Sequence, residues 1–187
     1  MLQLLDEREI YLRTYEDLNA VESMKNNICY VALDYKAELS KYSKSNENDV
    51  PYTLPDGNVI HLKEERFKCP EILFQPEFLD LGYNSLQETV INTVNKCHPD
   101  HQEYLYKNII LTGGTTLFNG FSERLQKEVF NRCPLRCPVN ISAPRERGHS
   151  VWLGGSIIAT LSAFRKNWIT KEEYLNIGAA VANAKHL

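Results

Sequence analysis

The sequence predicts a mixed α/β fold, and three patterns support this prediction. The apolar run 109–111 is followed by a paired-glycine turn, Gly113-Gly114, and then by a helix whose apolar residues recur at every fourth position from Phe121. Residues 52–62 flank a Pro-Asp-Gly-Asn turn, which is typical of a β-hairpin. Residues 85–96 have the apolar spacing of an amphipathic helix. Strands and helices are therefore both expected.

The composition argues against several classes of protein. The 187 residues are 43% apolar and 24% charged, which is ordinary for a soluble globular protein. A net charge of −3 argues against a nucleic-acid surface, which would concentrate lysine and arginine. No apolar run has the length of a membrane span, and residues 1–6 are too short and too acidic for a signal peptide. The five cysteines lack a disulfide-framework spacing, so a reduced, intracellular setting is expected.

The first part of the chain is expected to surround the hairpin with helices. Helical spacing predicts a helix up to Met24, residues 28–33 predict a strand, and the polar stretch 40–49 predicts a surface excursion. A short helical turn from Lys63 is expected to end at Pro70. The residues of the opening helix expected to face inward are Leu12, Tyr15, Leu18 and Val21.

The proline-bearing loop 74–81 places apolar side chains outside regular structure. These are Phe78, Leu79 and Leu81. Exposed apolar residues on a loop indicate contact with a partner. The alternative is that they pack onto the local core, and the residues alone leave both interpretations open.

In the second part we expect helices at 85–96 and 102–106, separated at Pro99, and strands at 108–111 and 139–142. A loop is expected at 144–148. The helix from Phe121 should bury Phe121, Leu125 and Val129 and turn Glu123, Arg124, Lys127 and Glu128 toward water.

Two helices are expected to close the chain. The first begins near Gly154, and the second has a capping box, Thr170 with Glu173, and ends at Gly178. The residues that the first of these helices should bury are Ile157, Ile158, Leu161 and Phe164.

The glycine turn allows two interpretations. Free N–H groups and the dipole at a helix N-terminus favour anionic or polar ligands, as in nucleotide sites. Paired glycines are also common in ordinary connections between a strand and a helix, and spacing alone favours this plainer interpretation.

Four blocks of sequence favour the nucleotide interpretation. Residues 111–129, residues 150–164 with their continuation 168–174, residues 65–76 and residues 29–34 closely resemble the actin family, in the family's own order. The resemblance covers essentially the whole chain. It implies a fold similar to the sugar kinases and heat-shock ATPases, in which two α/β halves close on ATP or ADP and a divalent cation, Mg²⁺ or Ca²⁺.

The resemblance places nucleotide contacts on individual residues. Gly113, Gly114 and Thr115 match the glycine turn beside the nucleotide, Leu117 and Phe118 match the residues beside the adenine, and Lys25 matches a lysine near the ribose and base. Three neighbours depart from the family: Glu22 stands for arginine, Asn26 for glutamate and Gly148 for lysine. Two cations are lost and a carboxylate is gained at Glu22, so attraction for a polyanionic nucleotide should be weaker.

The blocks match the C-terminal half of the family fold. Residues 1–80 would form a small outer subdomain, 81–149 part of the large subdomain with an incomplete sheet, and 150–187 helices that pack on the N-terminal half or on a partner in its place. The phosphate-binding hairpins and the residues that position the attacking water belong to the family's other half. We therefore expect no catalytic residue, no ATP hydrolysis and no normal filament from these residues alone, and an unpaired edge on the strand 108–111.

The resemblance implies a cytoplasmic, cytoskeletal protein, with the nucleus as a second compartment. Its intact form would be an ATP-regulated filament protomer that binds other actin-like protomers and actin-binding proteins. The alternative is a divergent scaffold subunit that does not polymerise. The replacements named above favour it, as does Asn167, which stands for a methionine at the family's partner groove. A kinase on the same scaffold would need a catalytic carboxylate and phosphate hairpins that the sequence lacks.

Two groups of metal-binding residue types have irregular spacing. These are Cys97-His98-x-x-His101 and Cys133-x-x-x-Cys137. Thiolate and imidazole suit zinc, but the groups lie on separate elements, and surface histidines with half-buried cysteines explain them more simply. No metal site is predicted.

Overall fold

The computed structural model describes residues 1–43, 49–80, 82–133 and 137–185. The chain divides into two compact units, residues 1–148 and residues 149–187, and each is described by itself. Within the described ranges, no helix has the length and apolarity needed to cross a membrane. The finer division at residues 80 and 149 stays a prediction.

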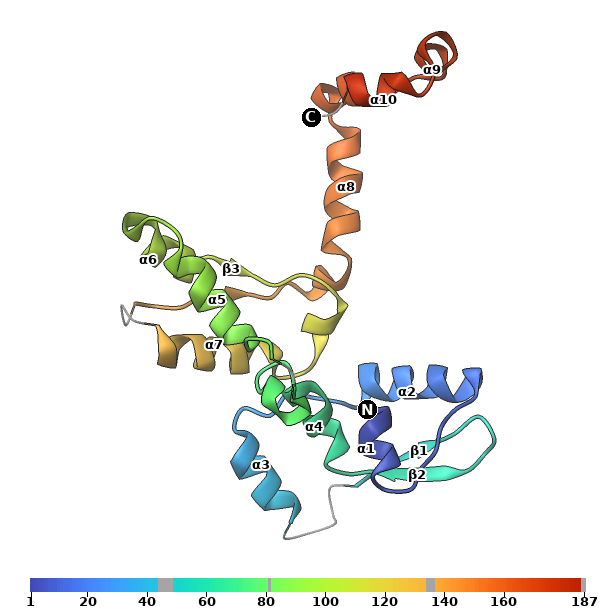
Figure 1. The fold of residues 1–187 in the computed structure, drawn as a ribbon, viewed down its shortest axis with the longest axis vertical. Coiled ribbons are helices and arrows are strands. Elements are labelled where there is room, and N and C mark those ends of the chain that lie inside the picture. Colours follow the sequence, from blue (N-terminus) through green and yellow to red (C-terminus); the bar gives the residue numbers. More distant parts are fainter. Residues whose placement is uncertain (44–48, 81, 134–136, 186–187) are drawn as a thin grey trace. The chain divides into compact units, whose positions relative to one another are not determined.

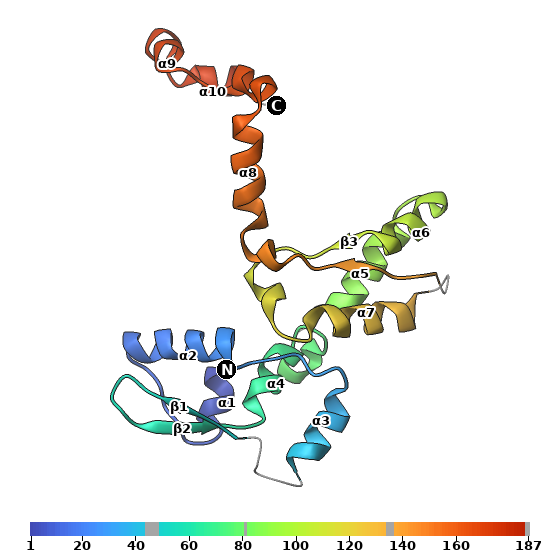
Figure 2. The ribbon, with the colours of Figure 1, turned by 180° about the vertical axis from the view of Figure 1, so that it is seen from behind.

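Unit 1 mixes short helices with two small sheets (Figures 1 and 2). In chain order its elements are α1 (Leu2–Asp6), α2 (Tyr15–Asn27), α3 (Tyr35–Tyr42), β1 (Val50–Thr53), β2 (Val59–Leu62), α4 (Glu65–Glu71), the 3₁₀ turn η1 (Pro76–Leu79), α5 (Leu86–Asn95), α6 (Pro99–Lys107), β3 (Ile109–Ile110), the 3₁₀ turn η2 (Gly114–Leu117), α7 (Phe121–Arg132), β4 (Ile141–Ser142) and the 3₁₀ turn η3 (Arg145–His149), which runs into unit 2. Among the described residues β1 pairs with β2, and β3 pairs with β4.

The hairpin is confirmed, and it packs against α1 and α2 (Figure 1). The expected opening helix is split, because residues 7–14 separate α1 from α2. Thr14 starts α2 by accepting the N–H of Asp17 and forming a capping box. Tyr15 and Leu18 are exposed and not inward as predicted, because α2 turns a different face to the core. The buried residues of this first cluster are Leu5, Leu12, Ala20, Val21, Met24, Leu54 and Leu62.

The strand expected at 28–33 is wrong. Ile28 is the helical C-cap of α2, and the extended segment that follows it, residues 29–32, forms a single β-bridge, between Tyr30 and Asn119. Pro70 does not end the helical turn as predicted, because it lies inside α4. A proline has no N–H for the carbonyl four residues before it, and that carbonyl, of Arg66, accepts the N–H of Tyr30 over 3.0 Å. The extended segment therefore binds the helix at the position that Pro70 leaves open.

The polar stretch 40–49 is more structured at its start than predicted. Residues 40–42 end α3, and Tyr42 is buried with its ring centroid 5.2 Å from that of Phe67. Residues 44–48 lie outside the described residues. In the loop 74–81, Phe78 is 49% exposed although its ring also contacts Tyr35, and Leu79 is 39% exposed. Leu81 lies outside the described residues.

The second part of unit 1 follows the sequence more closely. Helices α5 and α7 lie side by side over a parallel pair in which Ile109 faces Ile141 and Ile110 faces Ser142 (Figure 1). The predicted strands are confirmed but short. Pro99 begins α6, as its fixed φ allows at a first helical turn, so this helix starts earlier than expected. The buried residues of this cluster are Val31, Phe74, Val94, Tyr106, Leu111, Phe121, Leu125, Val129, Cys133, Cys137 and Val139.

Unit 2 contains α8 (Ser150–Thr160), the 3₁₀ turn η4 (Ser162–Asn167), α9 (Lys171–Ile177) and α10 (Ala180–Ala184). Helix α8 starts before Gly154, so the predicted start there is wrong. Its residues are all described and none is buried, so the expected burial of Ile157 and Ile158 is wrong within these residues. Leu161 is also exposed, and Phe164 is only partly buried. The capping box of Thr170 and the end of α9 at Gly178 are confirmed.

Candidate functional site

The glycine turn after β3 is held by hydrogen bonds to η3. Gly113 has φ +94°, a conformation that glycine adopts without the cost of a Cβ. Its N–H donates to the Arg147 carbonyl over 2.9 Å, so this amide already has a partner. Gly114 is the first residue of turn η2, which lies between Gly113 and α7, and the N-cap of α7 is Gly120. The N-terminus of α7 therefore does not adjoin the paired glycines.

Arg147 clamps the same turn through its side chain. Its Nε and Nη2 donate to the Thr116 carbonyl over 3.2 and 3.0 Å, and its Nη1 donates to the Pro144 carbonyl over 2.9 Å. Sequence reasoning treated 144–148 only as a loop and missed this role. An arginine whose partners are all main-chain carbonyls leaves no signal in the sequence.

A cavity of about 170 Å³ lies between α2, the end of α4 and η2. It brings Lys25 together with two other predicted site residues, Thr115 and Phe118, although they are some ninety positions away in the chain. Its full lining is Lys25, Asn26, Cys69, Pro70, Ile72, Leu73, Thr115 and Phe118.

The remaining predicted residues, Gly113, Gly114 and Leu117, are not part of this lining. Leu117 is 46% exposed and lies beside Gly148, where an added Cβ would come 3.0 Å from the Leu117 Cδ1. A longer side chain at position 148 would therefore press on Leu117. The departure at Gly148 thus changes the surroundings of a predicted adenine-side residue.

The lining combines an apolar wall with a few polar groups. Phe118 and Ile72 offer apolar surface, Thr115 offers a hydroxyl, and Asn26 offers an amide. Lys25 is half-buried, and no carboxylate among the described residues forms an ion pair with it. A free ammonium beside a flat apolar surface suits a ligand that joins an aromatic ring to polar oxygens.

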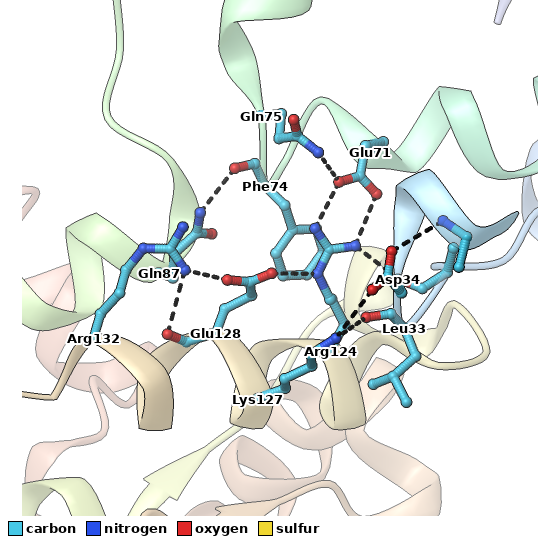
Figure 3. Close-up of polar contacts among 12 residues, drawn as sticks. Leu33, Asp34, Glu71, Phe74, Gln75, Gln87, Arg124, Lys127, Glu128 and Arg132 are labelled. Atoms are coloured by element: carbon cyan, nitrogen blue, oxygen red, sulfur yellow. Dashed lines mark hydrogen bonds and ion pairs between the residues drawn. The ribbon is translucent and has the colours of Figure 1, made fainter. Parts of the chain in front are cut away.

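A buried ion pair joins α4, whose end lines the cavity, to α7 (Figure 3). Arg124 of α7 binds Glu71 of α4 through two hydrogen bonds of 3.0 and 2.7 Å, and it donates to the Ala32 carbonyl over 2.7 Å. Its guanidinium lies 4.9 Å from the centre of the Phe74 ring. The arrangement joins α4, the extended segment and α7, so it fixes α4 relative to the part of the chain that follows η2.

Arg124 also binds Glu128 one turn along α7, over 2.7 Å, and Arg132 contacts the same carboxylate (Figure 3). Burial lowers the pKa of Arg124, but the hydrogen bonds to Glu71 and Glu128 outweigh burial and raise it. The prediction that Arg124 faces water is wrong, since the residue is 5% exposed. Helical spacing placed it on the polar face, and its buried partner is 53 positions away.

The cysteine and histidine groups lie apart from the cavity. The Cys133 and Cys137 sulfurs are 3.3 Å apart and buried. Cys97 is exposed and precedes His98 and His101 in the chain. Within the described part of the chain, no three histidine, cysteine or acidic residues gather in a way that could hold a metal ion.

A comparison with protein families gives a match over nearly the whole chain. The family model described as Actin matches residues 4–186, which covers nearly all of both units and all six predicted site residues. The match is independent of the cavity described above.

Proposed function

Because this chain belongs to the actin family, we propose that it is an actin-like cytoskeletal protein whose cavity between α2, α4 and η2 receives the base and ribose end of an adenine nucleotide. The observation that supports this most is the convergence of Lys25, Thr115 and Phe118 on one cavity. In the intact family arrangement the protein would be an ATP-regulated filament protomer in the cytoplasm.

The size of the cavity limits this proposal to part of the ligand. Pockets for ligands of nucleotide size measure roughly 300–1,000 Å³, and this one measures about 170 Å³. A planar base with part of the sugar is the portion that matches an apolar wall and one ammonium. The phosphates, with Mg²⁺ or Ca²⁺, would lie beyond the described lining.

The second candidate is a scaffold subunit that binds partners and does not polymerise. Asn26 lies in the cavity wall, and Gly148 lies beside Leu117. At the first position the resemblance expects a carboxylate and at the second a cation. Both changes alter the surroundings of the ligand, and they favour weak nucleotide binding with retained partner binding.

Titration of a fluorescent adenine nucleotide, in the presence of Mg²⁺, tests the proposed site. Loss of a hydrogen bond from a charged donor costs about 1.5–3 kcal/mol, so Lys25→Met should raise Kd by roughly tenfold or more. The control is Lys36→Met, an exposed lysine in α3 away from the cavity. Equal affinities for the two variants would contradict the site.

Sedimentation separates the two candidate functions. A filament protomer should pellet with actin filaments in an ATP-dependent manner, whereas a scaffold subunit should stay in the supernatant and elute in a complex of defined mass. Binding of the nucleotide without sedimentation, together with elution in a complex of defined mass, would retain the site and favour the scaffold function.

A further inference from the structure

Two cysteine sulfurs meet at the C-terminal end of α7. The Sγ atoms of Cys133 and Cys137 are 3.3 Å apart, and the two residues are 5% and 6% exposed. Bonded sulfur atoms are about 2.05 Å apart, so these two need to approach by little more than about 1 Å. Neither residue lines the cavity of the proposed nucleotide site.

Contacts on both sides hold this pair together. Cys133 is the C-cap of α7, where the chain leaves the helix with an extended ψ of 120°, and its N–H donates to the Val129 carbonyl over 2.8 Å. The chain after Cys137 packs back onto α7, because Val139 is buried and its carbonyl accepts a hydrogen bond from the Gln126 side chain over 3.1 Å. The distance between the sulfurs is therefore set by the fold around them.

The surroundings of the pair favour a covalent link over a metal ion or a reactive thiolate. A structural zinc site takes four ligands, and within the described ranges no three histidine, cysteine or acidic residues gather to hold a metal. Burial, together with the hydrogen bond to Cys133, raises the pKa of Cys137 to about 11, whereas a nucleophilic cysteine has a lowered pKa. Both residues belong to the apolar cluster around Tyr106. A disulfide is uncharged and suits this interior.

We propose that Cys133 and Cys137 are a disulfide-forming pair, which a small-molecule disulfide oxidises reversibly in the folded chain. The thiolate of one cysteine attacks a sulfur of the oxidant, the S–S bond of the oxidant breaks, and one small thiolate leaves. The sulfur of the other cysteine then attacks the protein sulfur of this mixed disulfide, a bond between the two protein sulfurs forms, and the second small thiolate leaves. The two leaving thiolates take up the two protons that the cysteines lose. Two protein thiols are thus oxidised, and one small-molecule disulfide is reduced to two thiols.

The oxidant reaches the pair when the last turn of α7 opens. Helix ends open at a much lower free energy than the core, and the side chain of Arg132, which ends α7, is 46% exposed. Once formed, the bond joins the end of α7 to the segment that enters β4. It should therefore slow hydrogen exchange of the Cys133 amide, which bonds to Val129 in the last turn.

The test compares the folded chain with the urea-unfolded chain in the same buffer of reduced and oxidised glutathione. Trypsin cleaves after Arg132 and Arg136, so the two cysteines fall on separate peptides. Mass spectrometry after acid quenching and alkylation measures the fraction of these peptides that is linked. Because the fold holds the sulfurs together, the equilibrium constant for the link should be at least about tenfold larger in the folded chain. The folded chain should reach the same linked fraction from its reduced and its oxidised forms.

Two variants provide the controls. Cys137→Ser should abolish the linked peptides and leave Cys133 as a thiol or joined to glutathione. Cys97→Ser replaces an exposed cysteine and should leave the linked fraction unchanged. In the parent chain, glutathione on Cys97 shows that the oxidant is active, and far-ultraviolet circular dichroism shows whether each variant is folded.

Three results would overturn the proposal. One is an equilibrium constant in the folded chain that is equal to or smaller than that in the unfolded chain. Another is a folded chain in which Cys97 joins glutathione while Cys133 and Cys137 remain thiols. The third is a link from Cys133 or Cys137 to a different cysteine in place of the expected one. None of these results depends on nucleotide binding, so the inference is tested separately from the proposed function.

Discussion

Arg124 and Glu71, which are 53 positions apart, form a two-pronged ion pair in the interior of unit 1. Their side chains are 6% and 0% exposed. Moving two charges out of water costs several kcal/mol for each, and the pair offsets this cost only through its geometry and its additional hydrogen bonds. The Ala32 carbonyl and the Gln75 side chain supply such bonds (Figure 3). The pair therefore acts mainly to specify how α4 and α7 meet.

Arg124→Met should destabilise the chain strongly. The variant leaves the Glu71 carboxylate buried without its cation, a change that typically costs about 3–5 kcal/mol. The free energy of unfolding from urea titration, followed by circular dichroism, measures the loss.

Two controls separate charge from packing in this experiment. Lys127→Met removes an exposed cation one turn away in α7 and should change stability by less than about 1 kcal/mol. The double variant with Glu71→Leu removes both charges and should recover much of the loss, since an apolar pair can replace a buried ion pair. A double variant less stable than Arg124→Met would contradict this account.

The sequence predicted correctly those elements that are formed by interactions between residues close together in the chain. The hairpin, the capping box of Thr170 and helix α7 are specified by residues within a few positions of one another, and the structure has all three. The segment 28–33 failed because its apolar residues suited a strand, while its hydrogen-bonding partners, Arg66 and Asn119, come from distant parts of the chain. The prediction that Arg124 faces water was wrong for the same reason, because its partner Glu71 is 53 positions away in the chain.

Stability should fall in acid partly through Glu128. Burial raises the pKa of this carboxyl, but hydrogen bonds from Arg132 and Arg124 outweigh burial and lower it in the folded state. A lowered folded pKa contributes stability that is present above the unfolded value, about 4.3. This contribution is lost as the pH falls through that value toward the folded pKa. The free energy of unfolding should therefore decrease from about pH 5 downward.

Glu128→Gln provides the check on that assignment. The variant should be less stable than the parent chain near neutral pH, and its stability should depend less steeply on pH below about 5. Glu103→Gln serves as the control, because Glu103 makes an exposed ion pair with Lys107 on α6. If the free energy of unfolding depends on pH in the same way in the parent chain and in Glu128→Gln, then Glu128 does not contribute to the loss of stability in acid.

Ser85→Ala should weaken the start of α5. The Ser85 side chain accepts the Glu88 N–H over 3.4 Å, and the Glu88 carboxylate accepts the Ser85 N–H over 2.9 Å. Loss of such a cap typically costs about 0.5–2 kcal/mol, whereas glycine at the same position costs only a few tenths. Urea titration of Ser85→Ala and Ser85→Gly should therefore rank alanine below glycine. The reverse order would show that the cap contributes little.

The sequence predicted which residues belong to the candidate site, but it did not predict how they are arranged in space. The family resemblance named Lys25, Thr115 and Phe118, and no local pattern could place a lysine of α2 against a turn some ninety positions later. The occupied N–H of Gly113 was not predictable, because its acceptor is the carbonyl of Arg147. Long-range main-chain contacts of this kind decide which amides of a glycine turn remain free.

Gly120→Ala should be the most damaging of three glycine substitutions. Gly120 has φ +78°, and an added Cβ would come within 3.0 Å of the Val31 carbonyl oxygen, which is main chain and cannot rotate away. Gly57 has φ +88° with open space around it, so Gly57→Ala should cost only the conformational strain of about 1–2 kcal/mol. Gly114 has neither constraint, and Gly114→Ala should be neutral or slightly stabilising.

The order of these three variants in urea titration tests the contact between the extended segment and α7. Val31 donates its N–H to the Asn119 carbonyl over 2.8 Å, so any movement that relieves the clash at residue 120 also strains this bond. Hydrogen exchange of the Val31 amide should accelerate in Gly120→Ala and stay unchanged in Gly57→Ala. Equal costs for Gly120→Ala and Gly57→Ala would mean that the close approach to Val31 does not restrict the segment, and the placement of Cys29 against α4 would then depend on Arg66 alone.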